Sequence, residues 1–212
     1  MRTVFFDLDG TLTDPSTGIT RCIQYALKEL EQTPPMADDL TWCIGPPLLQ
    51  SLEKLVPPGQ APQALRLYRE RFGDVGWREN RVYPDVPKLL EELRAAGIVM
   101  HLATSKPHVY ATRIVRHFGL RPFITQVFGS ELDGTRTDKS ELLHHALESV
   151  ATSGAVIMVG DRHHDILGAR ANSLEAIGVS YGFGSRDELT GAGARYVVDS
   201  PAELAPLLMK FP

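Results

Sequence analysis

Two carboxylates follow directly after a short, strongly apolar run near the N-terminus. Residues 4–6 (Val-Phe-Phe) are strand-forming, and Asp7 and Asp9 come next in the sequence Asp-Leu-Asp-Gly. Gly10 permits a sharp backbone turn at the end of such a strand. Holding two carboxylates together is costly unless a cation lies between them. The stretch therefore predicts a strand that ends in an acidic, cation-binding loop.

From residue 84 onward the chain alternates between helix-like and strand-like segments. Amphipathic helical patterns end at Gly97 and Gly119, and near-continuous apolar runs lie between the helices. Strands are expected at residues 98–103, 123–128, 155–159, 176–179 and 196–198. This alternation predicts an α/β fold with a doubly wound parallel sheet, in which ligands bind beyond the carboxyl ends of the strands.

Residues 15–83 show no strand-like alternation and have the pattern of a helical insertion. Ser16 or Thr17 can cap a first helix, and helical spacing of apolar residues continues to about Asn80. We therefore expect two domains. Residues 1–14 and 84–212 would form an α/β core, and residues 15–83 a small all-helical domain.

The composition is that of an ordinary globular protein, with 23% charged and 43% hydrophobic residues in a chain of 212. A formal charge of −4 gives no basic surface for nucleic acid or an anionic membrane, and no stretch is long enough to span a bilayer. The N-terminal apolar run stops at Asp7, so no secretory signal is expected. Cys22 and Cys43 match no metal-binding spacing, and reduced thiols are favoured over a disulfide. A cytoplasmic location is expected.

A second pair of carboxylates follows a later strand. Asp161 and Asp165 stand four residues apart just after residues 155–159, so both lie on one side if a helix begins there. Two like charges in this arrangement require a counter-ion, and Mg2+ suits because it is a hard cation that prefers carboxylate oxygens. The alternative for Asp165 is an ordinary helix N-terminal charge, which stabilises a helix by under ~1 kcal/mol.

Four stretches, taken in order, resemble the motifs of the haloacid dehalogenase (HAD) superfamily, and specifically of its phosphatases. They are residues 7–14 (Asp-Leu-Asp-Gly-Thr-Leu-Thr-Asp), residues 102–107 (Leu-Ala-Thr-Ser-Lys-Pro), Lys139, and residues 160–165 (Gly-Asp-Arg-His-His-Asp). Residues 44–48, 129–136 and 178–185 resemble the phosphoglycolate phosphatase and 5′-nucleotidase-like branch. The resemblance implies a Rossmann-like catalytic core, with the helical insertion as a cap domain.

The resemblance also implies a covalent mechanism. Asp7 would be the nucleophile that attacks phosphorus and forms an aspartyl-phosphate, while Asp9 would protonate the leaving alkoxide and later activate water. Asp9 must hold a proton part of the time, so its acidic neighbours are expected to raise its pKa. The alternative is an acidic turn with a structural role only.

Three residues would bind the phosphate. Thr104 can donate its hydroxyl to a phosphate oxygen, and Ser105 can add its hydroxyl or its backbone N–H. Lys139, at a helix start, would hold both the nucleophile and the transferring phosphoryl group, a contact that is stronger in a water-poor site. Without the other motifs, Lys139 would be taken as a solvated helix residue.

The implied cofactor is Mg2+. Its expected ligands are the side chains of Asp7 and Asp161 and the backbone carbonyl of Asp9, with substrate phosphate and water completing the shell. Asp165 would orient this shell from outside.

The expected function is that of a Mg2+-dependent phosphomonoester phosphatase that acts on a small phosphorylated metabolite, either 2-phosphoglycolate or a nucleoside 5′-monophosphate. The protein would work as a monomer or homodimer, without nucleic acid or membrane as partner. The alternative from another class is a receiver-like or scaffolding α/β domain that binds phosphate or metal without turnover. Within enzymes, a phosphomutase is less favoured, and Asp9 disfavours a dehalogenase because halide leaves without a proton.

Three other polar stretches receive no chemical role. Residues 131–135 imitate the first motif but are interpreted as a turn that positions Lys139. His163 and His164 are adjacent, so their side chains should diverge and share no ion. Residues 182–186 are glycine-rich but lack a strand–turn–helix phosphate-binding pattern.

Overall fold

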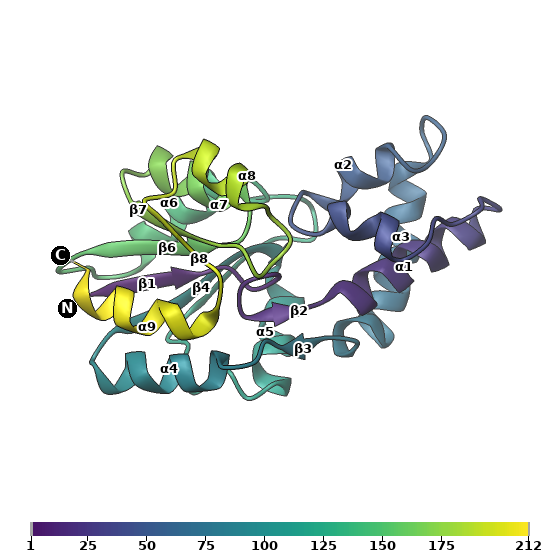
Figure 1. The fold of residues 1–212 in the computed structure, drawn as a ribbon. Coiled ribbons are helices and arrows are strands. Elements are labelled where there is room, and N and C mark those ends of the chain that lie inside the picture. The colour runs from purple at the N-terminus through teal and green to yellow at the C-terminus, as the bar shows by residue number, and fades with distance from the viewer. Residues whose placement is uncertain (1, 212) are drawn as a thin grey trace. The chain divides into compact units, whose positions relative to one another are not determined.

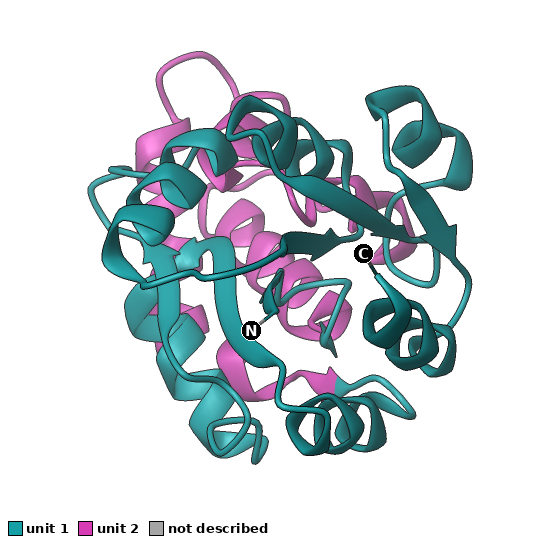
Figure 2. Ribbon diagram, turned by 90° about the vertical axis from the view of Figure 1, so that its left-hand side faces the viewer, with its two compact units in different colours: residues 1–13, 82–212 teal, residues 14–81 magenta. Residues whose placement is uncertain are grey.

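A computed structural model describes residues 2–211, in which the chain forms two compact units (Figure 2). Unit 1 contains the described residues of 1–13 and 82–212, and unit 2 contains residues 14–81. The chain leaves unit 1 in strand β2 (Thr13–Asp14) and returns in β3 (Arg81–Val82), and these two short strands pair with each other. The units divide the chain within two residues of the expected domain boundaries.

Unit 1 is built on a six-stranded parallel sheet with the strand order β5-β4-β1-β6-β7-β8. The strands are β1 (Thr3–Phe6), β4 (Val99–Pro107), β5 (Val127–Ser130), β6 (Val156–Gly160), β7 (Glu175–Val179) and β8 (Tyr196–Val198). From β1 the chain adds β4 and β5 on one side and then crosses to add β6, β7 and β8 on the other. This reversal places a topological switch point at the carboxyl ends of β1, β4 and β6, where ligands bind in doubly wound sheets.

Helices cover both faces of the sheet (Figure 1). They are α4 (Val86–Ala95), α5 (His108–His117), α6 (Lys139–Ser149), α7 (His163–Ala171), α8 (Arg186–Ala192) and α9 (Pro201–Lys210). Helices α4, α5 and α9 lie on one face, and α6, α7 and α8 on the other, as right-handed crossovers require. The predicted α/β fold is confirmed.

The core of unit 1 explains why β1 is the central strand. Every residue of β1 is buried, and the Phe5 ring packs against His101 of β4 and Phe128 of β5. Fully burying a side chain such as that of Phe5 stabilises the fold by about 1.5–3 kcal/mol. The same strand that anchors the sheet therefore ends at Asp7.

Unit 2 is helical. Its elements are α1 (Ser16–Glu29), the 3-10 helix η1 (Asp38–Cys43), α2 (Leu48–Glu53), α3 (Ala61–Asp74) and the 3-10 helix η2 (Gly76–Arg78). Helix α1 packs on α3 and η2, and Gly18 allows the close approach, since a Cβ there would lie 2.2 Å from the carbonyl oxygen of Gly76. No helix within residues 2–211 has both the length and the apolar character needed to cross a membrane.

Three local predictions were wrong. Neither Ser16 nor Thr17 caps helix α1, because the helix already begins at Ser16. The Ser16 backbone N–H at the helix start donates instead to Oδ1 of Asp14 at 2.9 Å. Strand β5 begins only at Val127, because residues 120–124 form turns that bond back to α5 and to each other. Strand β4 runs on to Pro107, with a register shift between Thr104 and Pro107.

Candidate active site

The predicted site residues Asp7, Thr104 and Asp161 lie at the carboxyl ends of the three central strands. Asp7 follows β1 and its backbone N–H donates to the Val159 carbonyl of β6 at 2.9 Å, while Thr104 lies in β4 and Asp161 follows β6. All three side chains belong to buried residues. The topology therefore brings together residues that are far apart in the sequence.

Lys139 connects this group to the opposite layer. It is the first residue of α6, which Asp138 caps by accepting the N–H groups of Ser140 (2.8 Å) and Glu141 (3.1 Å). Because α6 starts at this residue, the Lys139 side chain extends to the carboxyl ends of β1 and β4, where it contacts Asp7 and the Ala103 carbonyl. Its stem fits because α7 carries Gly168, where a Cβ would lie 2.7 Å from Lys139 Cγ.

The Lys139 ammonium is fully engaged by oxygen atoms. Its Nζ donates to Asp7 Oδ1 at 2.9 Å, to Asp165 Oδ1 at 2.7 Å and to the Ala103 carbonyl at 2.9 Å. Burial alone would lower the pKa of Lys139, but the carboxylates of Asp165 and Asp7 outweigh burial and raise it. Lys139 therefore stays positively charged at neutral pH and fixes one oxygen of Asp7.

Asp7, Asp161 and Asp165 form a cluster that can hold a metal ion, with one carboxylate oxygen of each lying within 4.8 Å of the others. Burial raises the pKa of Asp161 well above its ordinary value, and the charges of Asp165 and Asp7 raise it further. Burial also raises the pKa of Asp7, although Lys139 opposes the shift. Burial favours the neutral form of a carboxyl group unless enough positive charge lies beside it.

The charges of this cluster fit a divalent cation. When its three buried carboxylates are ionised, the cluster has one buried ammonium and two uncompensated negative charges. Oδ1 of Asp161 is buried and has no hydrogen-bond partner in the described part of the chain. An orphaned, buried carboxylate oxygen in an all-oxygen donor set is the arrangement that a hard cation satisfies. The carboxylate of Asp165, expected to act from outside, lies within the same ligand distance as the other two.

The glycine-rich stretch after β7 holds Asp161 in place, a role that the sequence analysis did not assign. The backbone N–H of Phe183 donates to Asp161 Oδ2 at 2.7 Å. A Cβ on Gly182 would lie 2.5 Å from Asp161 Cβ, and one on Gly184 would lie 2.0 Å from the Asp161 carbonyl oxygen. Glycines are therefore required for this close approach of two loops.

We expect Gly184→Ala to destabilise the protein by about 1–3 kcal/mol, because the added methyl group must displace the backbone of Asp161. Gly191→Ala is the matched control, since nothing lies within 4 Å of a Cβ there and alanine suits helix α8 better than glycine. Urea unfolding of both variants measures the difference. Equal stabilities would contradict the proposed packing.

Asp9 is buried beside a lysine that the sequence analysis quoted but did not assign. The Lys106 Nζ lies 2.7 Å from Asp9 Oδ2, and both side chains are about one-tenth exposed or less. Burial raises the pKa of Asp9, and Lys106 opposes the shift only in part. The expected rise is present, but burial and not the acidic neighbours is its main cause. The sequence signal that could have identified Lys106 is a charged residue at the end of an otherwise buried strand.

Thr104 and Ser105 lie where β4 becomes irregular. Thr104 is buried, and its hydroxyl oxygen accepts the backbone N–H of Lys106 at 3.3 Å. The Ser105 carbonyl accepts the hydroxyl of Ser130 from β5 at 2.8 Å. The pairing of β4 with β5 is irregular here, with a register shift between Thr104 and Pro107. Phosphate binding by Thr104 and Ser105 stays a prediction.

Glu188 of α8 organises the segment between the two later carboxylates. One of its oxygens accepts from Arg162 Nε at 3.0 Å and from the backbone N–H of His163 at 2.9 Å, and lies 2.6 Å from His163 Nδ1. Burial would raise the pKa of Glu188, but these hydrogen bonds outweigh it and lower the pKa to about 2. The His163 and His164 ring centroids are 3.8 Å apart, so the prediction that adjacent histidines diverge was wrong.

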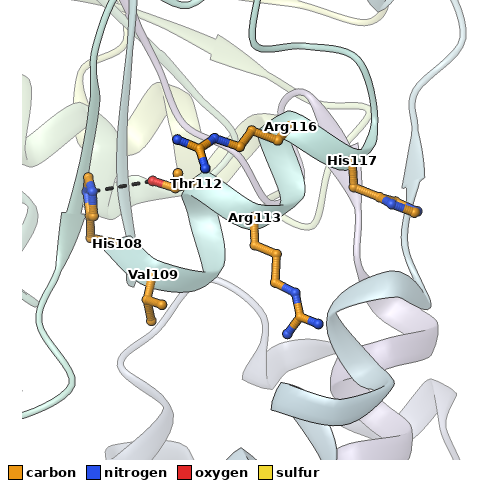
Figure 3. Close-up of a pocket in the computed structure, with 6 residues that line it drawn as sticks. All are labelled: His108, Val109, Thr112, Arg113, Arg116 and His117. Atoms are coloured by element: carbon orange, nitrogen blue, oxygen red, sulfur yellow. Dashed lines mark hydrogen bonds between the residues drawn. The ribbon is translucent and has the colours of Figure 1, made fainter.

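A separate hollow of about 680 Å³ runs along the exposed side of α5 (Figure 3). Its lining residues are His108, Val109, Thr112, Arg113, Arg116 and His117. Within it, Thr112 Oγ1 lies 3.3 Å from His108 Nε2. None of these residues carries a carboxylate or belongs to the acidic cluster. The hollow is therefore separate from the acidic cluster at the carboxyl ends of the strands.

Known proteins resemble this chain along most of its length. The haloacid dehalogenase-like hydrolase family matches residues 4–179. A 5′-nucleotidase of Pseudomonas aeruginosa is 49% identical over 189 residues, which cover 88% of this chain and 86% of that protein. The tyrosine-protein kinase PtkA of Mycobacterium tuberculosis is 37% identical over 185 residues, which cover 87% of this chain and 64% of the kinase.

The fold has a close counterpart among solved structures. The crystal structure of a predicted phosphatase from Clostridium acetobutylicum matches with a TM-score of 0.94 at 39% identity, covering 99% of both chains. The family and the fold expected from the motifs are confirmed. The chain belongs to the haloacid dehalogenase-like hydrolase family.

Proposed function

We propose that the protein is a phosphomonoester phosphatase that works through an aspartyl-phosphate on Asp7. The observation that carries this proposal is the Lys139 contact. Its ammonium holds Asp7 Oδ1 at 2.9 Å and places a buried positive charge beside this buried carboxylate. A buried cation beside a carboxylate favours its ionised, nucleophilic form and also attracts a phosphate dianion.

In the first step, the Asp7 carboxylate attacks phosphorus, the bond from phosphorus to the ester oxygen breaks, and Asp9 gives its proton to the departing alkoxide. In the second step, Asp9 takes a proton from water, whose oxygen attacks phosphorus and releases inorganic phosphate and the free Asp7 carboxylate. The raised pKa of Asp9 suits a group that must hold and then recover a proton. Thr104 would orient the phosphoryl oxygens, and the positive charge of Lys139 would attract them.

Asp7 and Asp161, with Asp165 in reach, are the side chains that would hold Mg2+, together with the backbone carbonyl of Asp9. When bound, Mg2+ neutralises phosphate charge that would otherwise repel the carboxylates. The uncompensated charge of the cluster and the orphaned oxygen of Asp161 support this cofactor.

Among small phosphate esters, a nucleoside 5′-monophosphate is the preferred substrate. The support is the relative at 49% identity, which is named a 5′-nucleotidase. The second candidate is 2-phosphoglycolate. Selection between the two would fall to a cap domain, the role that the family resemblance implies for residues 15–83.

Release of inorganic phosphate tests the proposal. Purified protein with Mg2+ should hydrolyse p-nitrophenyl phosphate and a nucleoside 5′-monophosphate, and should prefer the nucleotide to 2-phosphoglycolate. Removing metal with EDTA should lower the rate at least ~100-fold, because the lost charge stabilisation amounts to several kcal/mol, and added Mg2+ should restore it.

The same assay separates the competing functions. No phosphate release with or without Mg2+ would favour a receiver-like or scaffolding domain. Transfer of phosphate between sugar hydroxyls would indicate a phosphomutase. Labelling of a tyrosine peptide from ATP, without hydrolysis of monoesters, would favour the activity named for the mycobacterial relative.

A further inference from the structure

The two oxygens of Asp9 lie in different environments. Oδ2 is paired with the Lys106 ammonium at 2.7 Å, whereas Oδ1 is buried and has no hydrogen-bond partner among residues 2–211. Both side chains are almost fully buried, so exchange of the pair with water is restricted. Lys106 therefore holds the carboxyl group of Asp9 through one oxygen, while the other oxygen is buried without a hydrogen-bond partner in the described part of the chain.

This asymmetry determines where a proton can reside on Asp9. A lysine ammonium has hydrogen-bond donors and no acceptor. While Lys106 donates to Oδ2, a proton on that oxygen would face another donor without an acceptor. The proton of neutral Asp9 would then sit on Oδ1, the buried oxygen that has no hydrogen-bond partner among the described residues.

We propose that Lys106 is a positioning residue for proton transfer by Asp9: by occupying Oδ2 it directs the acidic proton on Oδ1 toward the leaving group. The inference rests on the proposed phosphatase function and extends it. Lys106 does not itself give up a proton. The proton on Oδ1 moves to the ester oxygen as its bond to phosphorus breaks, and the carboxylate left behind remains paired with Lys106.

The backbone around Lys106 is built to hold this position. The register shift in β4 places residues 105 and 106 outside the regular pairing with β5. The Lys106 N–H donates to the Thr104 hydroxyl oxygen at 3.3 Å. On the opposite side, a Cβ on Gly129 would lie 2.8 Å from the Lys106 carbonyl oxygen, so this loop packs directly on the β5 backbone.

Two other roles for Lys106 predict different kinetics. A purely structural ion pair would lower the rates for all esters by the same factor when it is removed. A direct contact with the substrate phosphate would raise KM for all esters equally. Positioning of the acid instead predicts a loss that grows with the basicity of the leaving group, because only a poor leaving group needs the proton.

The test compares Lys106→Met and Lys106→Arg with the wild type, using p-nitrophenyl phosphate, phenyl phosphate and adenosine 5′-monophosphate. For Lys106→Met, we expect kcat/KM to fall about 100-fold with the nucleotide and less than about 5-fold with p-nitrophenyl phosphate. Lys106→Arg keeps the charge and the donors, and should recover most of the loss. Lys88→Met is the control, because this exposed lysine of α4 should leave all three rates unchanged.

A double-mutant cycle with Asp9→Asn completes the test. If Lys106 acts through Asp9, Lys106→Met should add no further dependence on the leaving group in the Asp9→Asn protein. Thermal unfolding must show that each variant is folded, and Lys106→Gln replaces Lys106→Met if the latter is not. Equal losses for all esters, or additive effects in the cycle, would overturn the inference. Failure of the wild type to hydrolyse any ester would instead overturn the proposed function.

Discussion

Asp7→Asn should lower kcat/KM for phosphate monoesters by at least ~10⁴-fold, because removing a covalent nucleophile leaves only the binding and electrostatic contributions to the rate. Asparagine has nearly the same shape but cannot form the acyl-phosphate. The variant should stay folded, since burial already makes the ionised form of Asp7 costly and raises its pKa. The loss would therefore be chemical and not a consequence of unfolding.

The covalent intermediate gives a second measurement on the same variant. Acid quenching of wild-type protein during turnover should leave a phosphate group on the peptide that contains Asp7, and the Asp7→Asn protein should show none. Asp187→Asn, an exposed carboxylate in the first turn of α8, is the matched control and should behave as wild type. Retention of more than about 1% of the activity by Asp7→Asn would exclude Asp7 as the nucleophile.

The residues that the sequence could predict share one property: each lies next to a recognisable strand end or helix start. Asp7 follows an apolar strand, Asp161 follows another, and Lys139 comes after the helix-capping Asp138. Because the carboxyl ends of parallel strands meet at one edge of a sheet, local patterns were enough to bring these side chains together.

Other residues of the site depend on contacts that no local pattern encodes. Phe183 and Glu188 reach the loop after β6 only because β7 lies beside β6 in the sheet, and this strand order is a property of the whole fold. Lys106 meets Asp9 because β4 is irregular after Thr104. The contact of Glu188 with the His163 ring could not be predicted from the adjacent positions of His163 and His164. Long-range packing decided each of these positions.

Asp161→Asn should strongly lower Mg2+-dependent turnover and yet stabilise the metal-free protein. Activity at saturating Mg2+ should fall about 10²–10³-fold, comparable to the loss of a preorganised electrostatic group in other active sites. Without metal, the change removes a buried charge that repels Asp7 and Asp165. The asparagine oxygen can still accept the Phe183 N–H, and its amide can donate to a neighbouring carboxylate.

The pH dependence of unfolding follows from the same shift. Asp161 has a pKa raised in the folded state relative to about 3.9 in the unfolded chain, so the folded protein binds more protons above that value. The metal-free wild type should therefore lose stability as pH rises from about 4 toward the folded pKa of Asp161, and then level off. Urea unfolding in EDTA should show a smaller loss for Asp161→Asn, and some loss will remain because the pKa values of Asp7 and Asp9 are raised too.

Metal should reverse the order of the two proteins. A cation that binds only the folded state stabilises it according to its concentration and affinity, so Mg2+ should raise the unfolding midpoint of the wild type far more than that of Asp161→Asn. In EDTA near neutral pH the variant should be the more stable protein, and in millimolar Mg2+ the wild type should be. If Mg2+ shifts both midpoints equally, Asp161 is not a ligand. If the two midpoints also coincide in EDTA, the charge of Asp161 does not destabilise the metal-free protein. Something other than a bound cation would then neutralise the carboxylate cluster.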